Sequence, residues 1–232
     1  LVRIVLKDFA SVTLDQHLVL RCFHFLLPDL LNFQDNFQAA VHLIRGPLGE
    51  IPSNPDPRSQ VVFRKQAGNL LQPQIGIKVG RPSYHKARSI KDCLKAVGKR
   101  RWTIERKYDG EYCEVHVDLS KGRDCIQLFS KSGKDSTQDR SAVHDSIRKA
   151  LRVGTPECRF KRTCILLGEL VVYSDKEQKV LEFHKLRKHI SRSGSFLGTE
   201  QDSQAHQHER LMIVYFDVLM VDEEVVLRQP HR

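Results

Sequence analysis

The stretch Glu105-Arg106-Lys107-Tyr108-Asp109-Gly110-Glu111 stands directly before the clearest strand pattern in the sequence. From Tyr112 to Leu119 polar and apolar residues alternate, which is typical of a β-strand with two unlike faces. A turn over 120–124 and a second strand over 125–131 then predict a hairpin. We also expect a strand to end just before Lys107, so that the lysine projects from a fixed backbone into a cleft.

The rest of the chain predicts helices before this hairpin and further strands after it. Apolar residues recur at helical spacing over 15–45 and 58–71, on either side of an extended, proline-rich linker at Ile51–Pro57. Shorter helices are expected over 84–98, where Ser89 can start a helix at Ile90–Val97, and over 139–152. Later strands are expected over 163–173, 179–183, 211–221 and 224–228. This order predicts an α+β fold, with a helical segment and linker over 1–75 and a mostly antiparallel sheet domain over 76–232.

The formal net charge of +10 is concentrated in one part of the chain. Residues 76–107 contain 11 basic and 2 acidic residues, a net charge of +9, together with the aromatic side chains of Tyr84 and Trp102. A run of charge is often only a solvated surface. Because so few acids offset this one, we favour a polyanionic partner or a phosphate-bearing substrate.

Length and composition limit the classes of protein that fit. With 232 residues, 40% of them hydrophobic, the chain can form a core and is not expected to be disordered. No apolar run approaches the ~20 residues that span a bilayer, and the charged start Leu1–Asp8 has no signal-peptide pattern, so we expect no membrane partner. Six cysteines without close pairs predict reduced thiols in an intracellular protein.

Lys107 is the strongest candidate for a reactive side chain. A lysine amine is protonated at neutral pH, because its ordinary pKa is about 10.4, and the protonated form is no nucleophile. Burial and a neighbouring cation such as Arg106 favour the free amine, which can attack a carbonyl carbon or a phosphorus. The alternative is a charged hairpin edge held by ion pairs.

Polar residues also accompany the later strands. The segment Phe129–Thr137 is rich in hydrogen-bond donors, although a plain polar turn would have the same composition. Glu169 and Asp217 are single acids inside apolar strands. A buried carboxylate needs a partner or a metal ion, whereas a carboxylate on an edge strand can simply face water.

Four elements of the sequence occur together in a recognisable order. They are Lys107-Tyr108-Asp109-Gly110, Phe129-Ser130-Lys131-Ser132-Gly133, Gly168-Glu169-Leu170-Val171 and Tyr215-Phe216-Asp217-Val218-Leu219. In this order and spacing the chain resembles the eukaryotic-type ATP-dependent DNA ligases, which are covalent nucleotidyltransferases. The resemblance implies an ATP-grasp-like adenylation domain over 76–232. Residues 28–52 more loosely resemble the end of the helical DNA-binding region that precedes that domain.

The first element implies the chemistry. By resemblance, Lys107 is the nucleophile that attacks the α-phosphorus of ATP, releases pyrophosphate and keeps AMP as a phosphoramidate. Glu105 matches the position that receives the adenine amino group, and Asp109 and Gly110 match the turn that aims the lysine. AMP would then pass to the 5′-phosphate at a nick in double-stranded DNA, where the 3′-hydroxyl displaces it.

The later elements imply the rest of the nucleotide site. Lys131 matches a basic position that contacts ribose or phosphate, Glu169 a carboxylate that binds ribose or a metal ion, and Phe216 an aromatic ring that stacks on adenine. The implied cofactors are ATP and Mg²⁺, because the ion neutralises the triphosphate and the leaving pyrophosphate. The implied setting is DNA repair and recombination in the nucleus, by a monomeric enzyme.

The sequence departs from the family in two places and ends early. Tyr112 stands where the family commonly has Arg, and Lys131-Ser132 replaces the commoner Arg-Asn pair, which keeps the charge but loses the bidentate fork. The family has two further signatures and a small β-barrel after the position of Phe216, whereas this chain ends at Arg232. We therefore expect a C-terminally truncated fragment.

Three other functions are compatible with parts of the pattern. An mRNA capping enzyme or RNA ligase shares the lysine signature, but the helical segment before residue 76 favours a DNA ligase. A degenerate, non-catalytic nucleic-acid-binding fragment is supported by Tyr112 and by the missing signatures. A Cys/His metal site is disfavoured, because His206 and His208 lie in a polar loop and no Cys-x-x-Cys spacing occurs.

Overall fold

The computed structural model describes residues 14–82, 84–192, 195–196 and 207–230. They fall into two units. The first runs to Gln72 and includes Val79–Arg81, and the second contains Pro73–Lys78 and the chain from Pro82 onward. The sequence-based boundary at 75/76 lies close to this division, while the roles given to the two parts stay predictions. No helix among the described residues is long and apolar enough to cross a membrane.

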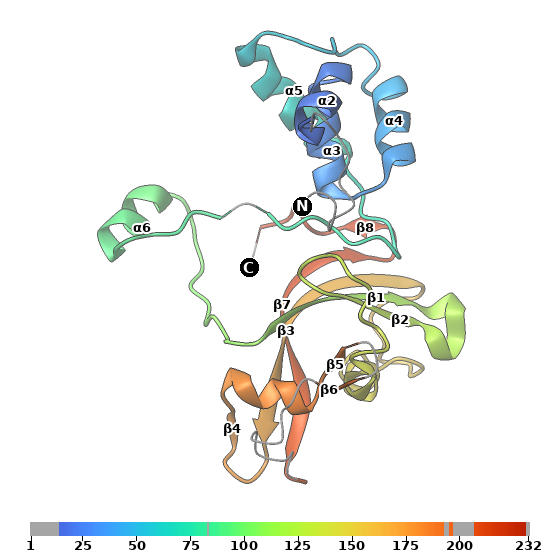
Figure 1. The fold of residues 1–232 in the computed structure, drawn as a ribbon, viewed down its shortest axis with the longest axis vertical. Helices are drawn as coiled ribbons and strands as arrows, with labels where there is room; N and C mark the ends of the chain where they lie inside the picture. The colour runs from blue at the N-terminus through green and yellow to red at the C-terminus, as the bar shows by residue number, and fades with distance from the viewer. Residues whose placement is uncertain (1–13, 83, 193–194, 197–206, 231–232) are drawn as a thin grey trace, which may run out of the picture. The chain divides into compact units, whose positions relative to one another are not determined.

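The first unit consists of short helices (Figure 1). They are α2 (Gln16–Phe23), α3 (Leu27–Phe33), α4 (Phe37–Arg45) and α5 (Pro57–Leu70). Asp15, Asn36 and Asp56 each accept a hydrogen bond from a backbone N–H in the first turn of α2, α4 and α5, which stabilises those helix starts. The helices expected over 15–45 and 58–71 are thereby confirmed.

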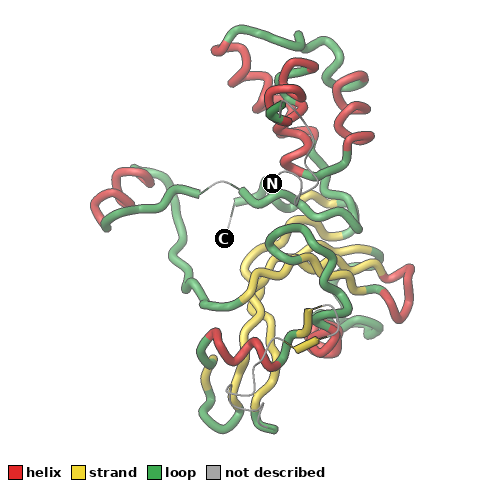
Figure 2. The backbone as a smooth tube through the Cα atoms, in the orientation of Figure 1, coloured by secondary structure: helices red, strands yellow, loops and turns green. Residues whose placement is uncertain are grey.

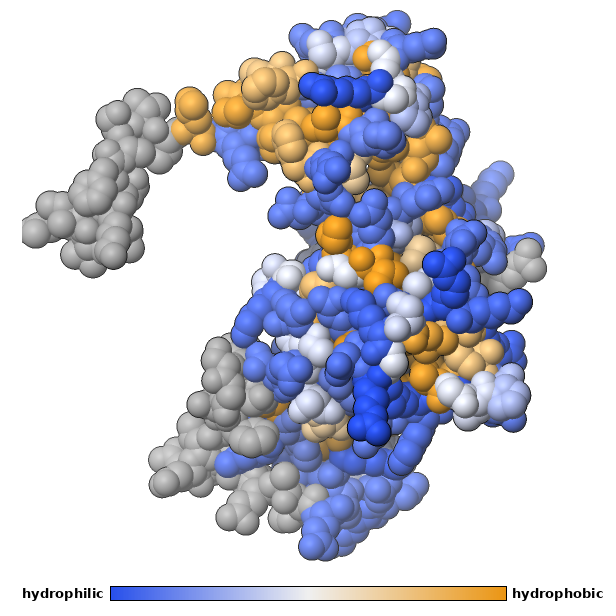
Figure 3. Space-filling view, turned by 90° about the vertical axis from the view of Figure 1, so that its right-hand side faces the viewer, coloured by the Kyte–Doolittle hydropathy of each residue, from blue (hydrophilic) through white to orange (hydrophobic). Residues whose placement is uncertain are grey.

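The residues between α4 and α5 belong to the core of this unit. The Ile51–Pro57 stretch is non-helical, as expected, but Ile51 is buried in the cluster around Phe25 and Leu48. The Phe25 N–H also donates to the Ser53 carbonyl oxygen at 2.9 Å. The stretch is therefore packed into the helical unit, between α4 and α5. Phe23 and Phe37 are among the exposed apolar side chains of this unit. Figure 3 shows hydrophobic surface on the helical unit.

The second unit is built on a curled antiparallel sheet (Figure 1). Its strand order is β2 (Ile126–Phe129), β1 (Glu111–Asp118), β3 (Thr163–Ser174), β7 (Glu209–Val221) and β8 (Glu224–Val225). The short β4 (Lys179–Val180) pairs with β3, and β5 (Ser191–Arg192) pairs with β6 (Ser195–Phe196). The predicted hairpin is confirmed as β1 and β2, joined by the 3-10 helix η1 (Leu119–Asp124). The fold is α+β.

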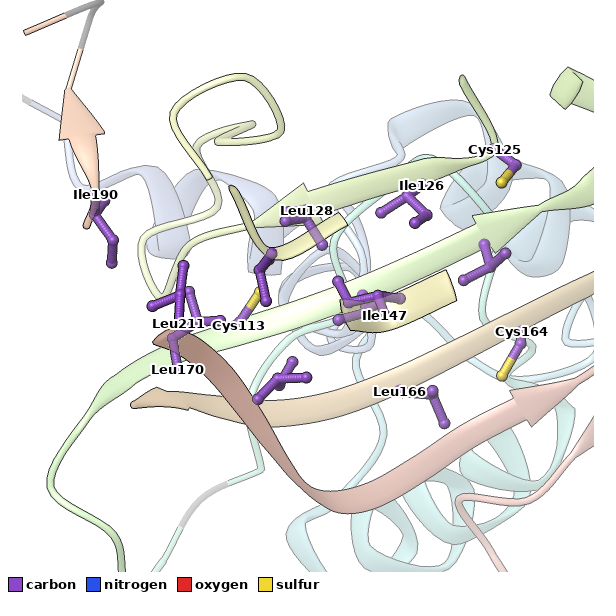
Figure 4. Packing of buried hydrophobic residues seen from close by; sticks show 14 of the residues in the cluster. Cys113, Cys125, Ile126, Leu128, Ile147, Cys164, Leu166, Leu170, Ile190 and Leu211 are labelled. Atoms are coloured by element: carbon purple, nitrogen blue, oxygen red, sulfur yellow. The ribbon is translucent and has the colours of Figure 1, made fainter. Parts of the chain in front are cut away.

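One face of the sheet carries the main hydrophobic core. Side chains from β1, β2, β3 and β7 converge on this face (Figure 4). The cluster also includes residues of η2 (Ser141–Val143), α7 (His144–Ala150) and η3 (Phe183–Lys188). Burial in it raises the pKa of the Cys113 thiol to about 12 and that of Cys164 to about 12, so both thiols stay protonated.

The segment before β1 differs from the expectation. Helix α6 (Ile90–Val97) begins at its cap Ser89, which confirms Ser89 as the start, and it fills only the second half of the wider 84–98 range. Long loop stretches flank it (Figure 2). Residues 101–109 form no strand, so the strand expected to end before Lys107 is wrong. Residues 101–107 are exposed, Trp102 and Ile104 included, so the segment lacks the buried apolar face that stabilises a strand.

Candidate functional site

Lys107 lies in the irregular segment before β1 and is exposed. Its Nζ donates to the Tyr108 carbonyl oxygen at 3.5 Å, a long hydrogen bond, and the Arg106 guanidinium lies 5.1 Å from the centre of the Tyr108 ring. Glu105 and Asp109 are exposed in the same segment. The expected placement of Lys107 at a strand end is therefore not what the structure shows. Its amine is reachable by a large substrate.

Gly110 connects this segment to the sheet. A Cβ atom at residue 110 would lie 2.7 Å from Glu169 Cγ and would overlap the carbonyl oxygen of Leu170. Only glycine permits so close an approach of the two backbones. The turn that follows Lys107 is thus packed directly on the strand that carries Glu169.

The register of the sheet defines the face on which Glu169 lies. Tyr112 of β1 is opposite Glu169 of β3, which in turn is opposite Val214 of β7. Opposed residues share a face, and their neighbours Cys113 and Gly168 therefore point to the core side. Glu169 lies, half-buried, on the face away from the main core. We call this side of the sheet the polar face.

Phe216 occupies a β-bulge in β7. Leu167 is opposite Asp217 and the next residue, Gly168, is opposite Tyr215, so Phe216 has no partner across the ladder. Its side chain is 39% exposed. A bulge bends the strand and re-aims a side chain, and bulges are common next to active sites. The large exposed ring is available to stack on a flat ligand.

Lys131 lies in the tight turn after β2. The Ser130 N–H donates to the Lys134 carbonyl oxygen at 2.9 Å, and Gly133 has a φ of +89°, which the turn needs. Lys131 itself is exposed. A Cβ atom at Gly133 would lie 3.5 Å from Lys78 Cδ, so this turn neighbours the Pro73–Lys78 segment.

The structure also shows a buried polar cluster that the sequence pattern did not reveal. Glu114 is fully buried, and its carboxylate accepts hydrogen bonds from the Tyr112 hydroxyl at 3.0 Å and from His116 Nε2 at 2.9 Å. Strict alternation along β1 indicated two different faces but not that both are covered. The sequence feature that could have indicated this cluster was the spacing of Tyr112, Glu114 and His116, which places all three on one face of a strand.

A second buried polar group was missed as well. The Arg140 side chain is 2% exposed, forms an ion pair with Glu111 and donates to the Ser136 hydroxyl. Glu111 directly follows Gly110, so this arginine ties the start of β1 to the turn that follows β2. A single arginine in a polar loop has no pattern that would mark it in advance.

The described residues contain no cluster of three or more His, Cys, Asp or Glu side chains that would hold a metal ion by itself. His206, weighed above for metal binding, lies outside the described residues. Mg²⁺ is commonly held by one or two carboxylates together with substrate phosphates. Glu169, a half-buried single carboxylate on the polar face, fits that kind of site.

Comparison with known proteins gives the same family as the motifs. The family model for the ATP dependent DNA ligase domain matches residues 84–232. The chain is similar to DNA ligase 4 of Dictyostelium discoideum, at 26% identity over 135 residues, which are 58% of this chain and 11% of that protein. It is also similar to DNA ligase 1 of Korarchaeum cryptofilum (strain OPF8), at 26% identity over 143 residues, 62% of this chain and 22% of that protein.

The two relatives are much longer than the matched region. The chain spans less than a quarter of the length of either one. The family model, in contrast, matches more than half of this chain and covers all four sequence elements described above. The protein therefore belongs to the ATP-dependent DNA ligase domain family.

Proposed function

We propose that the chain is the adenylation region of an ATP-dependent DNA ligase, with Lys107 as its nucleophile. The Lys107 amine, once it has lost a proton, attacks the α-phosphorus of ATP. A phosphorus–nitrogen bond forms, the bond to the β-phosphate oxygen breaks, and pyrophosphate leaves. The observation that carries this proposal is the packing of Gly110 on Glu169, because it joins two of the family's elements on adjacent strands.

The other predicted residues have roles that suit their positions. Phe216, exposed at its bulge, stacks on adenine, and Glu105 receives the adenine amino group. Glu169 binds ribose or the metal ion, and Lys131 contacts ribose or phosphate. Asp109 shapes the turn with Gly110. Two observations support these roles: Glu169 and Phe216 lie on strands of the same sheet, and Lys131 lies in a hydrogen-bonded turn after β2.

Mg²⁺ is the expected metal, with Glu169 as its protein ligand. When bound, it neutralises charge on the triphosphate and on the leaving pyrophosphate. The exposed position of Lys107 is compatible with a large triphosphate substrate. These residues form part of an ATP-grasp-like nucleotidyltransferase fold.

The later steps act on DNA. A 5′-phosphate oxygen at a nick attacks the phosphorus of the lysine-bound AMP, the phosphorus–nitrogen bond breaks, and the 3′-hydroxyl then displaces AMP to seal the strand. The relatives are named DNA ligases, and the basic segment 76–107 suits a polyanion. We place this activity in the nucleus, in DNA repair and recombination, in a monomeric protein.

Labelling with α-labelled ATP and Mg²⁺, followed by denaturation, tests the proposal. Label should stay on the wild-type chain and be lost in Lys107→Ala, while Lys99→Ala, an exposed lysine of the same basic segment, should keep it. Label only in a version extended past Arg232 would support the proposal for the longer protein. No label in either version contradicts it and favours a non-catalytic DNA-binding role. A preference for GTP would indicate a capping enzyme.

A further inference from the structure

Two residues of the Pro73–Lys78 segment, Gly76 and Lys78, contact side chains of strand β1. The Gly76 N–H donates to His116 Nδ1 at 3.0 Å. The Lys78 ammonium lies 3.9 Å from Glu114 Oε2, and the Lys78 side chain is only 14% exposed. Residues 73–78 precede the sheet by more than thirty positions in sequence, so both contacts are long-range.

The His116 ring hydrogen-bonds both to Gly76 and to Glu114, the partner of Lys78, and a single tautomer satisfies both bonds. Because the Gly76 N–H points at Nδ1, that nitrogen must accept, and the ring proton of the neutral histidine is on Nε2. Nε2 then donates to Glu114 Oε1 at 2.9 Å. Glu114 is fully buried, and a buried carboxylate is tolerated only when donors and a cation surround it. Tyr112, His116 and Lys78 are those groups.

Lys78 lies between two parts of the candidate site. Its ammonium is 5.7 Å from the centre of the Tyr112 ring, and Tyr112 is opposite Glu169 in the sheet. Its aliphatic stem borders Gly133, in the turn that carries Lys131. Losing the contacts of residues 73–78 would therefore loosen the packing beside both Tyr112 and this turn.

We propose that His116 and Glu114 are positioning residues for nucleotide binding. They hold the 73–78 segment, and with it Lys78, against the polar face of the sheet and so keep the Lys131 turn in place for the phosphates of a nucleoside triphosphate. Neither side chain touches the reacting atoms. The inference rests on the proposed function, since it assumes that ATP binds on this face.

Two substitutions of His116 separate the two hydrogen bonds of the ring. His116→Asn places an acceptor near the Nδ1 position and keeps the hydrogen bond from the Gly76 N–H. His116→Gln places its amide near the Nε2 position and keeps the hydrogen bond to Glu114. Each is made in a Lys107→Ala background, so that ATP binds without reacting. The readouts are hydrogen exchange of the Gly76 amide and the Kd for ATP from equilibrium dialysis.

The His116→Gln protein should exchange the Gly76 amide faster and bind ATP more weakly, each by about tenfold, as expected for one lost buried hydrogen bond. The His116→Asn protein should stay within about threefold of the parent in both. Val115→Ala is the matched control, because Val115 is fully buried on the opposite face of the same strand. It should lower stability without changing the Kd for ATP.

Three outcomes overturn the inference. One is unchanged Gly76 exchange or unchanged ATP affinity in His116→Gln; another is an equal loss of ATP affinity in Val115→Ala, which would indicate a purely structural role. If the parent binds no ATP while its Gly76 amide is protected, the proposed function fails, and the nucleotide role of His116 fails with it. Should His116→Gln not fold, Lys78→Met removes the ammonium, with its ion pair to Glu114 and its contact with the Tyr112 ring, and should change both readouts in the same direction.

Discussion

Gly110, three residues after Lys107, lies directly against Glu169 of the neighbouring strand. The Glu169 Cγ atom would be 2.7 Å from a Cβ atom at residue 110, well inside van der Waals contact. The two residues are 59 positions apart in sequence (169 minus 110) and belong to two different family elements. Their contact packs the end of the segment that carries the proposed nucleophile against strand β3.

Gly110→Ala should therefore damage both stability and nucleotide transfer. The added methyl group forces β1 and β3 apart, at a cost of about 1–3 kcal/mol in the free energy of unfolding, as overpacked sites show. Gly68→Ala is the control, since nothing lies within 4 Å of its Cβ position in helix α5. That change should stabilise by about 0.5–1 kcal/mol. Urea denaturation measures the stability of each variant, and labelling with ATP measures its nucleotide transfer. A fully active, equally stable Gly110→Ala protein would argue against the close contact.

Phe216→Ala should weaken ATP binding with little effect on stability. The ring is 39% exposed at a bulge, so its removal costs little core packing, whereas the stacking surface for adenine is lost. Phe183→Ala is matched in exposure, at 41%, and lies in η3. We expect the Kd for ATP to rise about tenfold only in Phe216→Ala, equivalent to ~1.4 kcal/mol of lost binding free energy. Equal effects in both proteins would refute the stacking role.

Tyr215→Phe should make the protein more stable. The Tyr215 hydroxyl is buried and has no hydrogen-bond partner among the residues that the structure describes, and burial raises its pKa. An unsatisfied buried hydroxyl costs about 1–3 kcal/mol, so the phenylalanine variant should gain roughly 1 kcal/mol in urea denaturation. Tyr173→Phe is the comparison, because the Tyr173 hydroxyl donates to Gln178 Oε1 at 3.2 Å. A loss of stability in Tyr215→Phe would show that its hydroxyl is bonded.

Asp222 should make stability depend on acid pH. Its carboxylate accepts from the backbone N–H groups of Lys161, Arg162 and Thr163, and these bonds, first that of Lys161, hold its pKa below the ordinary value of 3.8. A lowered carboxylate pKa stabilises the fold above that ordinary value, and the contribution is lost as pH falls through the folded pKa. Asp222→Asn keeps an acceptor but removes the charge.

We therefore expect Asp222→Asn to unfold more easily than wild type at pH 7, by about 1 kcal/mol for partly exposed charge-assisted bonds. The gap should narrow as pH falls below 3.8 and close once pH passes below the folded-state pKa, where the wild-type carboxyl group is also neutral. Urea denaturation at pH 7 and at a series of acid pH values measures the gap. A constant gap across this range would exclude the charge as its origin.

The basic surface of α6 and the loop after it should set the salt dependence of DNA binding. Lys91, Lys95 and Lys99 are all exposed. If each contacts a phosphate, changing all three to Glu should flatten the slope of log K against log salt by about 2–3, since each contact contributes about 0.9. Lys176→Glu, an exposed lysine after β3, should leave the slope unchanged. An unchanged slope in the triple variant would identify the run as a solvated surface.

Local chemistry explains why much of the fold could be predicted. Helix starts at Asp15, Asn36, Asp56 and Ser89 are set by side chains that bond the adjacent backbone, and the β1–β2 hairpin follows from alternation and a short turn. The order of the four motif elements was likewise enough to identify the family. These features depend on residues that are close in sequence, so a single sequence displays them.

The positions of the candidate residues could be predicted less well. Alternation showed that β1 has two faces, but only the tertiary structure shows Glu114 and His116 buried on the second face. The bulge that exposes Phe216 depends on the register between β3 and β7, which neither strand encodes alone. Lys107 was expected at a strand end, yet residues 101–107 are exposed and form no strand.

Most element types and the ligase-domain family could be predicted from the chain alone, because propensity, capping and motif order are read along it. The tertiary structure alone decided that Gly110 meets Glu169, that Arg140 meets Glu111, and that Gly76 is bonded to His116. Each of those contacts joins residues at least 29 positions apart, the shortest being the Arg140–Glu111 pair. They form only when the sheet closes, because closure brings distant backbone segments into contact and most buried polar groups then pair.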